Sequence, residues 1–168
     1  YYIPKGFLEP YRETYFNDSK ALLSIYADDA SGVLTKILSD EALRSEAADA
    51  IVSVMHSAGR DNSTVSFDGI VLDFEALRGA QKDNYTAFLY ELSDKLGDAQ
   101  LYIAIHPVMT GSYYDGYDYT HIGALADRVI LMAYDFDAQH LTEEEKAAKK
   151  QHIKEEIQAY ICMFLFIA

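Results

Sequence analysis

The stretch Asp68-Gly-Ile-Val-Leu-Asp-Phe-Glu75 predicts a buried β-strand that ends in two carboxylates. Because alternate residues of a strand point to the same face, Asp73 and Glu75 share one face with Val71. Apolar residues on both faces are typical of a strand in a parallel α/β sheet, which is covered on both sides. Buried charge is costly unless it is paired or used, so the two acids are candidates for chemistry at the carboxyl end of the strand.

Further strands and helices alternate along the chain on both sides of this stretch. The further strands are expected at 21–26, 101–106 and 128–134. The helices are expected at about 40–58, 83–96, 120–126 and 143–160. This alternation predicts an α/β fold of the (β/α) TIM-barrel type, with parallel strands and right-handed crossovers. A closed barrel typically has about 250 residues and needs at least about 200. Because the chain has 168, we expect a single domain over residues 1–168 that is an incomplete barrel or a fragment.

The composition of the chain argues against some classes of binding partner. A formal net charge of −13 argues against nucleic acid and anionic membrane surfaces, and it suits a neutral or cationic substrate. Solubility alone would explain the same charge. The longest apolar run, residues 161–168, is far short of the roughly 20 residues that span a bilayer. The open edges of an incomplete barrel would favour self-association.

Polar side chains also stand at the end of a second predicted strand. Tyr134 and Asp135 end the strand at 128–134 with a hydroxyl group and a carboxylate. Because the carboxyl ends of parallel strands lie at one edge of the sheet, these groups can converge with Asp73 and Glu75 on one cleft. The alternative is that the acids cap loops or pair with an arginine.

A tyrosine-rich loop is expected at the same edge. Tyr113, Tyr114 and Tyr117 have flat rings with a polar rim, which suit stacking on sugars and hydrogen bonding to their hydroxyls. His106 stands at the end of the strand 101–106 and is a further candidate for the lining of the cleft. The alternatives are tyrosines that pack inward and a structural histidine. The five histidines and the single Cys162 show no metal-ligand spacing, so no metal site is expected.

These residues resemble glycoside hydrolase family 18, the chitinase-like barrel family. The fourth strand of that family carries Asp-x-x-Asp-x-Asp-x-Glu, which this chain matches at Asp68, Asp73 and Glu75 and departs from at Val71. Its sixth strand often ends in Met-x-Tyr-Asp, which is similar to residues 132–135. The four expected strands resemble the third to sixth strands of the family, and the bacterial branch acting on cell walls and spore cortex is the most similar.

The resemblance implies a substrate-assisted retaining hydrolase of β-linked glycans that contain N-acetylglucosamine, of the chitin or peptidoglycan type, without a cofactor. Glu75 would protonate the glycosidic oxygen and later act as base for water. Asp73 would hold the 2-acetamido N–H group and stabilise the developing positive charge. Tyr134 would orient the acetamido oxygen, and Asp135 would orient the sugar. Asp68 would be structural.

Two other functions fit the same residues. One is a non-catalytic carbohydrate-binding protein on this scaffold, which the apolar Val71 favours. The other is an inactive, truncated barrel. In each case the family implies an extracellular, cell-wall or spore-associated setting in a bacterium.

Overall fold

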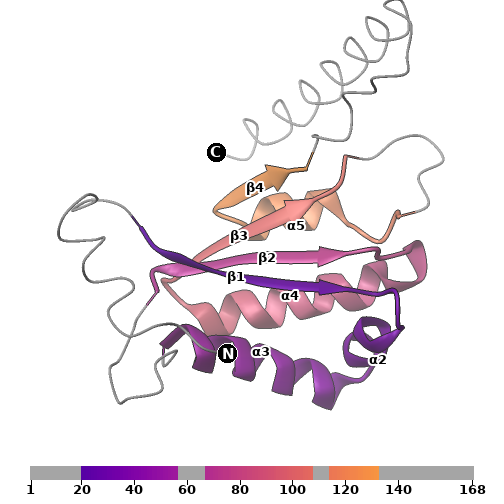
Figure 1. The fold of residues 1–168 in the computed structure, drawn as a ribbon, viewed down its shortest axis with the longest axis horizontal. Coiled ribbons are helices and arrows are strands. Elements are labelled where there is room, and N and C mark those ends of the chain that lie inside the picture. Colours follow the sequence, from indigo (N-terminus) through magenta and orange to yellow (C-terminus); the bar gives the residue numbers. More distant parts are fainter. Residues whose placement is uncertain (1–19, 57–66, 108–113, 133–168) are drawn as a thin grey trace, which may run out of the picture. The chain divides into compact units, whose positions relative to one another are not determined.

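The computed structural model describes residues 20–56, 67–107 and 114–132 (Figure 1). This part of the chain contains one sheet of four strands in the order β1-β2-β3-β4. The strands are β1 (Leu22–Asp28), β2 (Gly69–Glu75), β3 (Gln100–Ile105) and β4 (Arg128–Leu131). The helices are α2 (Val33–Ser39), α3 (Glu41–His56), the 3₁₀ turn η1 (Gly79–Gln81), α4 (Lys82–Leu96) and α5 (Tyr119–Leu125). The predicted alternation of strands and helices is therefore confirmed.

The chain divides into two compact units, Tyr1–Ile130 and Leu131–Ala168. The second unit contributes only residues 131 and 132 to the described part, so the account below concerns the first. The expected helix at 143–160 and the end of the expected strand at 128–134 lie outside the described residues. The expectation of one domain over 1–168 stays a prediction.

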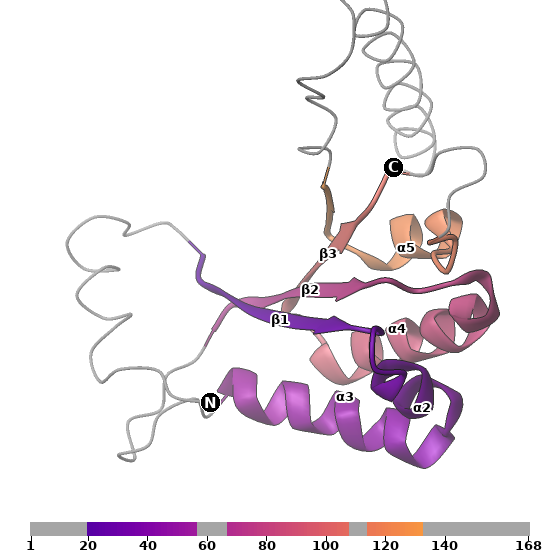
Figure 2. The ribbon, with the colours of Figure 1, turned by 45° about the vertical axis from the view of Figure 1, so that its right-hand side comes forward.

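The strands of the first unit are parallel and in register. Strand β1 pairs with β2 from Leu22 beside Gly69 to Asp28 beside Glu75, and β2 pairs with β3 in the same direction. Helices α3 and α4 run side by side along one face of these strands (Figures 1 and 2). The sheet therefore has the layered βαβ arrangement of a barrel wall.

The faces of β2 follow the predicted alternation. Ile70 and Leu72 are fully buried and Phe74 nearly so, whereas Val71, Asp73 and Glu75 on the opposite face are half-buried. Within the described part, helices cover the Ile70 face, and the face that carries the acids is open. This is the face that points into the interior of a closed barrel, where the side chains of further strands would pack.

Local interactions explain where α3 begins and why it packs on the sheet. The carboxylate of Asp40 accepts hydrogen bonds from the N–H groups of Ala42 (2.9 Å) and Leu43 (3.0 Å), which caps the helix. Ala48, Ile51 and Met55 then form a buried stripe at helical spacing. The boundaries agree with the expected helix at 40–58 to within two residues.

Helix α2 was not predicted. Its seven residues are too short to show a helical period of apolar residues, and only Leu34 and Leu38 are buried. Gly32, in the left-handed conformation at φ 72°, starts it, and Asp29 holds its first turn through the N–H group (2.7 Å) and the hydroxyl group of Thr35. The start of α2 therefore depends on contacts with the loop before it. The spacing of apolar residues in the sequence gives no information on such contacts.

Two aspartates hold the amino ends of neighbouring strands together. Asp68 accepts a hydrogen bond from the N–H group of Ala21 at 2.6 Å, and Asp127 accepts one from the N–H group of Leu101 at 2.8 Å. Each carboxylate therefore satisfies a backbone donor at the start of the adjacent strand. This places Asp68 in a structural role, at the end of β2 away from Glu75.

Candidate active site

Asp73 and Glu75 lie on the same face of β2 at its carboxyl end, as the alternation predicts. On β1 the register places Tyr26 beside Asp73 and Asp28 beside Glu75. On the other side of β2, just after β3, Nε2 of His106 lies 3.8 Å from Oε2 of Glu75. The side chains of His106 and Glu75 are about one third exposed, at 30% and 28%, so both are accessible from the open face. Groups from three neighbouring strands thus meet around Glu75.

The carboxyl group of Asp73 is in an unusual electrostatic environment. Burial raises its pKa above the ordinary value of 3.8, and the charge of His106 acts in the opposite direction. Its Oδ1 atom is buried and has no hydrogen-bond partner among the described residues. Repulsion between two acids at alternate positions of a strand raises the pKa of one of them. One pKa is raised, but the main cause is burial rather than the charge of Glu75.

Aromatic side chains support the strand between the two acids. The ring of Phe74 stacks on Phe88 with centroids 5.5 Å apart and packs against Tyr85 at 6.1 Å. The hydroxyl group of Tyr117 donates a hydrogen bond to the carbonyl oxygen of Phe74 at 2.8 Å. Because Phe74 stands between Asp73 and Glu75, fixing its ring and its carbonyl group also fixes the direction of both acids.

Tyr117 is therefore placed beneath the site. Its side chain is 1% exposed, packs edge-on against Tyr85, and has a pKa raised by burial. A buried ring cannot stack on a sugar, so the structure gives Tyr117 a supporting position, in contrast to the sugar contact expected from the sequence.

Tyr114, in contrast to the buried Tyr117, is exposed to solvent. It is 40% exposed, and its ring is stacked near His106 with centroids 6.3 Å apart and an interplanar angle of 29°. Asp115 accepts a hydrogen bond from the N–H group of Gly79 at 2.5 Å, and the N–H group of Gly116 donates to the carbonyl oxygen of Leu77 at 3.1 Å. The segment after β3 is thereby attached to the loop after β2, which brings Tyr114 close to the acids.

Ala76, directly after Glu75, has a strained backbone. Its φ of 61° is in the left-handed region, which costs a residue with a Cβ atom about 1–2 kcal/mol. This conformation turns the chain away from the strand immediately after Glu75. Non-glycine residues in such conformations cluster at functional sites, so the strain supports a functional role for the carboxyl end of β2.

The structure brings together four of the expected site residues at one edge of the sheet, namely Asp73, Glu75, His106 and Tyr114. Tyr113, Tyr134 and Asp135 lie outside the described residues. Two residues on the open face were not expected, Tyr26 at 59% exposed and Asp28. The period-two pattern of the first strand, continued past Tyr26 to Asp28, could have identified both.

Residues 20–56, 67–107 and 114–132 contain neither a metal-binding cluster nor a candidate membrane-spanning helix. No three His, Cys, Asp or Glu side chains are grouped so that they could hold a metal ion. No helix in these ranges is both long and apolar enough to cross a membrane.

The parallel βα wall and the acids at the end of β2 are the features of a barrel-type glycoside hydrolase. Comparison with protein families agrees, since the family "Glycosyl hydrolases family 18" matches residues 8–165. The chain belongs to this family, and the resemblance inferred from its sequence is confirmed.

One curated relative is the candidate sporulation-specific glycosylase YdhD of Bacillus subtilis strain 168. The two sequences are 39% identical over 79 residues, which are 44% of this chain and 19% of YdhD. The crystal structure of YdhD superimposes with a TM-score of 0.70 at 22% identity, covering 92% of this chain and 51% of that one. The chain thus spans about half of the YdhD chain in that structure.

Two other solved structures have a similar fold. A class V chitinase from Pseudomonas fluorescens Pf-5 gives a TM-score of 0.57 at 28% identity and covers 68% of this chain and 36% of its own. The spore cortex-lytic enzyme SleL of Bacillus megaterium QM B1551 gives 0.55 at 25% identity, with 72% and 29% covered. These two structures support the barrel-type fold of this chain.

Proposed function

We propose that this protein is a glycoside hydrolase that cleaves β-linked, N-acetylglucosamine-containing glycans with retention of configuration and assistance from the substrate. The observation that supports this most is the placement of Asp73 and Glu75 on one open face at the carboxyl end of β2. A proton donor and a second acid two residues before it are the groups that such a reaction requires.

In the first step, the acetamido oxygen of the substrate attacks the anomeric carbon while the glycosidic bond breaks. Glu75 gives its proton to the departing oxygen, and an oxazolinium ion forms on the sugar. In the second step, water adds to the anomeric carbon, the ring of the ion opens, and Glu75 takes the proton from that water. The partial exposure of Glu75 allows both the glycosidic oxygen and the water to reach it.

Asp73 is proposed to hold the acetamido group during this reaction. Its buried Oδ1 atom has no partner in the described part and is available as an acceptor for the acetamido N–H group. The raised pKa makes the neutral form of Asp73 more accessible before the substrate binds. As positive charge develops on the acetamido group, it favours the ionised form of Asp73, which stabilises the oxazolinium ion.

The remaining roles are proposed from the family pattern. Tyr134 would donate a hydrogen bond to the acetamido oxygen and fix its line of attack, and Asp135 would orient the sugar. Tyr113 and Tyr114 would contact sugar rings, and the exposure of Tyr114 beside His106 supports this for the second of them. No metal ion or cofactor takes part in this mechanism.

The setting is proposed from the relatives. A sporulation glycosylase and a spore cortex-lytic enzyme support a location at the bacterial spore or cell wall and a peptidoglycan substrate. The class V chitinase supports chitin instead. Both polymers contain β-linked N-acetylglucosamine, so the proposed chemistry is the same for both.

The proposal is tested by incubating the chain with chitooligosaccharides and with peptidoglycan at several pH values. We expect new reducing ends from at least one of them, and none from a Glu75→Gln variant that still binds. Saturable binding without release by the unchanged chain would overturn the hydrolase and support a carbohydrate-binding protein. Val71 favours that second function, because an apolar side chain cannot donate a hydrogen bond to Asp73. Aggregation or dimerisation without binding would support an inactive barrel with open edges.

A further inference from the structure

Tyr26 is the most exposed large hydrophobic side chain in the described part of the chain, at 59%. Exposed residues alternate along β1, at Ser24, Tyr26 and Asp28, so the phenol stands on the open face of the sheet. The register places Tyr26 beside Asp73 on the neighbouring strand β2 (Figure 2). Because adjacent strands are about 4.8 Å apart, a sugar held by Asp73 lies within reach of this ring.

The faces of the Tyr26 ring are available to a ligand. Tyr85 and Tyr117 pack edge-on against each other at 5.8 Å, whereas Tyr26 stacks on no other ring of the described residues. Its hydroxyl group donates a hydrogen bond to Oδ2 of Asp28 at 3.3 Å. This contact restrains the ring at its edge and leaves both of its faces open.

The chemistry of an exposed phenol suits the proposed substrate. In a β-linked N-acetylglucosamine ring the substituents are equatorial, so each face of the sugar presents C–H groups. The face of an aromatic ring is partly negative and attracts such groups. A tyrosine also loses little conformational entropy on binding, since only two side-chain torsions are fixed.

The position of Tyr26 distinguishes it from an ordinary surface tyrosine. Single exposed aromatic residues are common on proteins. Tyr90 is an example, since it is 49% exposed, belongs to helix α4 on the covered side of the sheet, and packs edge-on near His121. Tyr26 instead shares the open face with both acids and stands level with Asp73.

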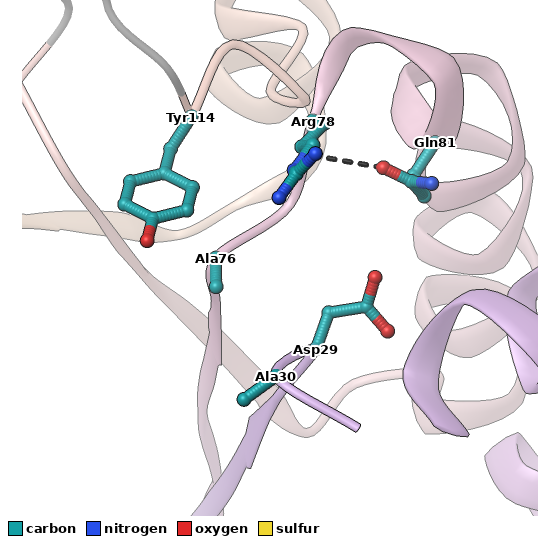
Figure 3. A pocket seen from close by; sticks show the side chains of 6 residues that line it. All are labelled: Asp29, Ala30, Ala76, Arg78, Gln81 and Tyr114. Atoms are coloured by element: carbon teal, nitrogen blue, oxygen red, sulfur yellow. Dashed lines mark hydrogen bonds between the residues drawn. The ribbon is translucent and has the colours of Figure 1, made fainter. Parts of the chain in front are cut away.

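A pocket of about 280 Å³ next to Ala76 is a weaker place for a sugar contact. The residues that line it are Asp29, Ala30, Ala76, Arg78, Gln81 and Tyr114 (Figure 3). Asp29 lies across from Arg78 in Figure 3, so the lining carries both signs of charge. The carboxylate of Asp29 already binds Thr35, and the N–H group of Arg78 donates to Oε1 of Gln81 at 2.9 Å. These interactions within the protein leave the open face as the better surface for a glycan.

We propose that the ring of Tyr26 stacks on the sugar that Asp73 holds, which makes Tyr26 a substrate-binding residue of this site. The assignment rests on the proposed function for the placement of the sugar. It does not depend on cleavage of the glycosidic bond, so the two are tested separately.

The first test uses fluorescence. The chain contains no tryptophan, so Tyr26→Trp in the Glu75→Gln chain introduces a single indole at the proposed contact. Acrylamide quenching of this indole is measured with and without saturating chitotetraose, and with a tetrasaccharide that alternates N-acetylglucosamine with N-acetylmuramic acid. Tyr90→Trp in the same chain is the control. We expect at least one glycan to protect the indole at position 26 from acrylamide and neither to protect the indole at position 90.

The second test uses calorimetry with the same two glycans. In the Glu75→Gln chain, Tyr26→Ala should weaken binding at least about fivefold because the stacked ring is lost. Tyr26→Phe keeps the ring and should stay within about twofold, as should Tyr90→Ala. Unchanged urea midpoints show that the variants are folded.

Several results would overturn the assignment. These are the absence of saturable binding of either glycan, no protection at position 26, unchanged affinity in Tyr26→Ala, and a loss in Tyr26→Phe as large as in Tyr26→Ala. Protection at position 26 without turnover by the chain that keeps Glu75 would reject the hydrolase and leave the stacking role standing. Turnover without protection would do the reverse.

Discussion

Nε2 of His106 lies 3.8 Å from Oε2 of Glu75, so an imidazole at the end of β3 faces the carboxyl group at the end of β2. The same imidazole acts on Asp73, where its charge lowers a pKa that burial raises. One side chain from the end of a neighbouring strand thus lies beside Glu75 and lowers the pKa of Asp73.

Replacing His106 by Gln should raise the pKa of Asp73 further, because the variant keeps the burial and loses the favourable charge. The side-chain ¹³C chemical shift of Asp73, followed by NMR as a function of pH, measures this directly. The control is His56→Gln, since His56 ends α3 far along the chain from the acids. A titration of Asp73 that is the same in the His106 variant as in the unchanged chain would contradict the account.

The raised pKa of Asp73 also predicts how stability depends on pH. A carboxyl group whose pKa is higher in the folded state favours folding below the unfolded value of 3.8, and that contribution is lost as the pH rises through the folded value. Asp73→Asn removes this dependence. In urea denaturation, the variant should therefore gain stability relative to the unchanged chain between about pH 4 and about pH 7. A variant that instead loses stability over this pH range would contradict the raised pKa of Asp73 in the folded protein.

Replacing Tyr117 by Phe should destabilise the fold by about 1–2 kcal/mol. The variant loses a buried hydrogen bond and leaves the carbonyl oxygen of Phe74 without its donor. Urea denaturation measures the change, with Tyr90→Phe as control because that ring is 49% exposed and its hydroxyl should contribute less than about 0.5 kcal/mol. If the two variants were equally stable, Tyr117 would not support the strand between the acids.

Replacing Gly116 by Ala should detach the segment that carries Tyr114. A Cβ atom at this position would lie 2.6 Å from the carbonyl oxygen of Arg78 and 2.7 Å from the carbonyl carbon of Leu77, so backbone atoms would have to move. Overpacking of this kind costs about 1–3 kcal/mol. We expect a lower urea midpoint and faster amide hydrogen exchange at Gly79, which bonds to Asp115. Unchanged exchange at Gly79 would contradict this close approach.

The sequence predicted the placement of Asp73 and Glu75 because side-chain alternation depends only on the strand itself. It also predicted the edge at which His106 and Tyr114 meet the acids, since parallel strands end together. The burial of Tyr117 could not be predicted in this way. Tyr114 and Tyr117 belong to the same loop, and contacts of that loop with Phe74, Leu77 and Gly79 decide which ring faces solvent.

The electrostatics of the site were harder to predict than its geometry. Two acids at alternate positions suggested mutual repulsion, whereas the pKa of Asp73 responds mainly to burial. Burial depends on the neighbouring strands, which place Tyr26 on one side of Asp73. The pocket beside Ala76 depends on three loops that are distant in sequence, so no single motif identifies it.

The central claim is that Glu75 is the proton donor of this site. The most direct test compares kcat/KM for a chitooligosaccharide or a peptidoglycan fragment among the unchanged chain, Glu75→Gln and Asp28→Asn. Asp28 is a matched carboxylate, beside Glu75 in the register but exposed and bonded to the N–H group of Ala30. We predict a loss of about 10²–10⁴-fold for Glu75→Gln and less than about tenfold for Asp28→Asn. Turnover that survives in Glu75→Gln would contradict the account.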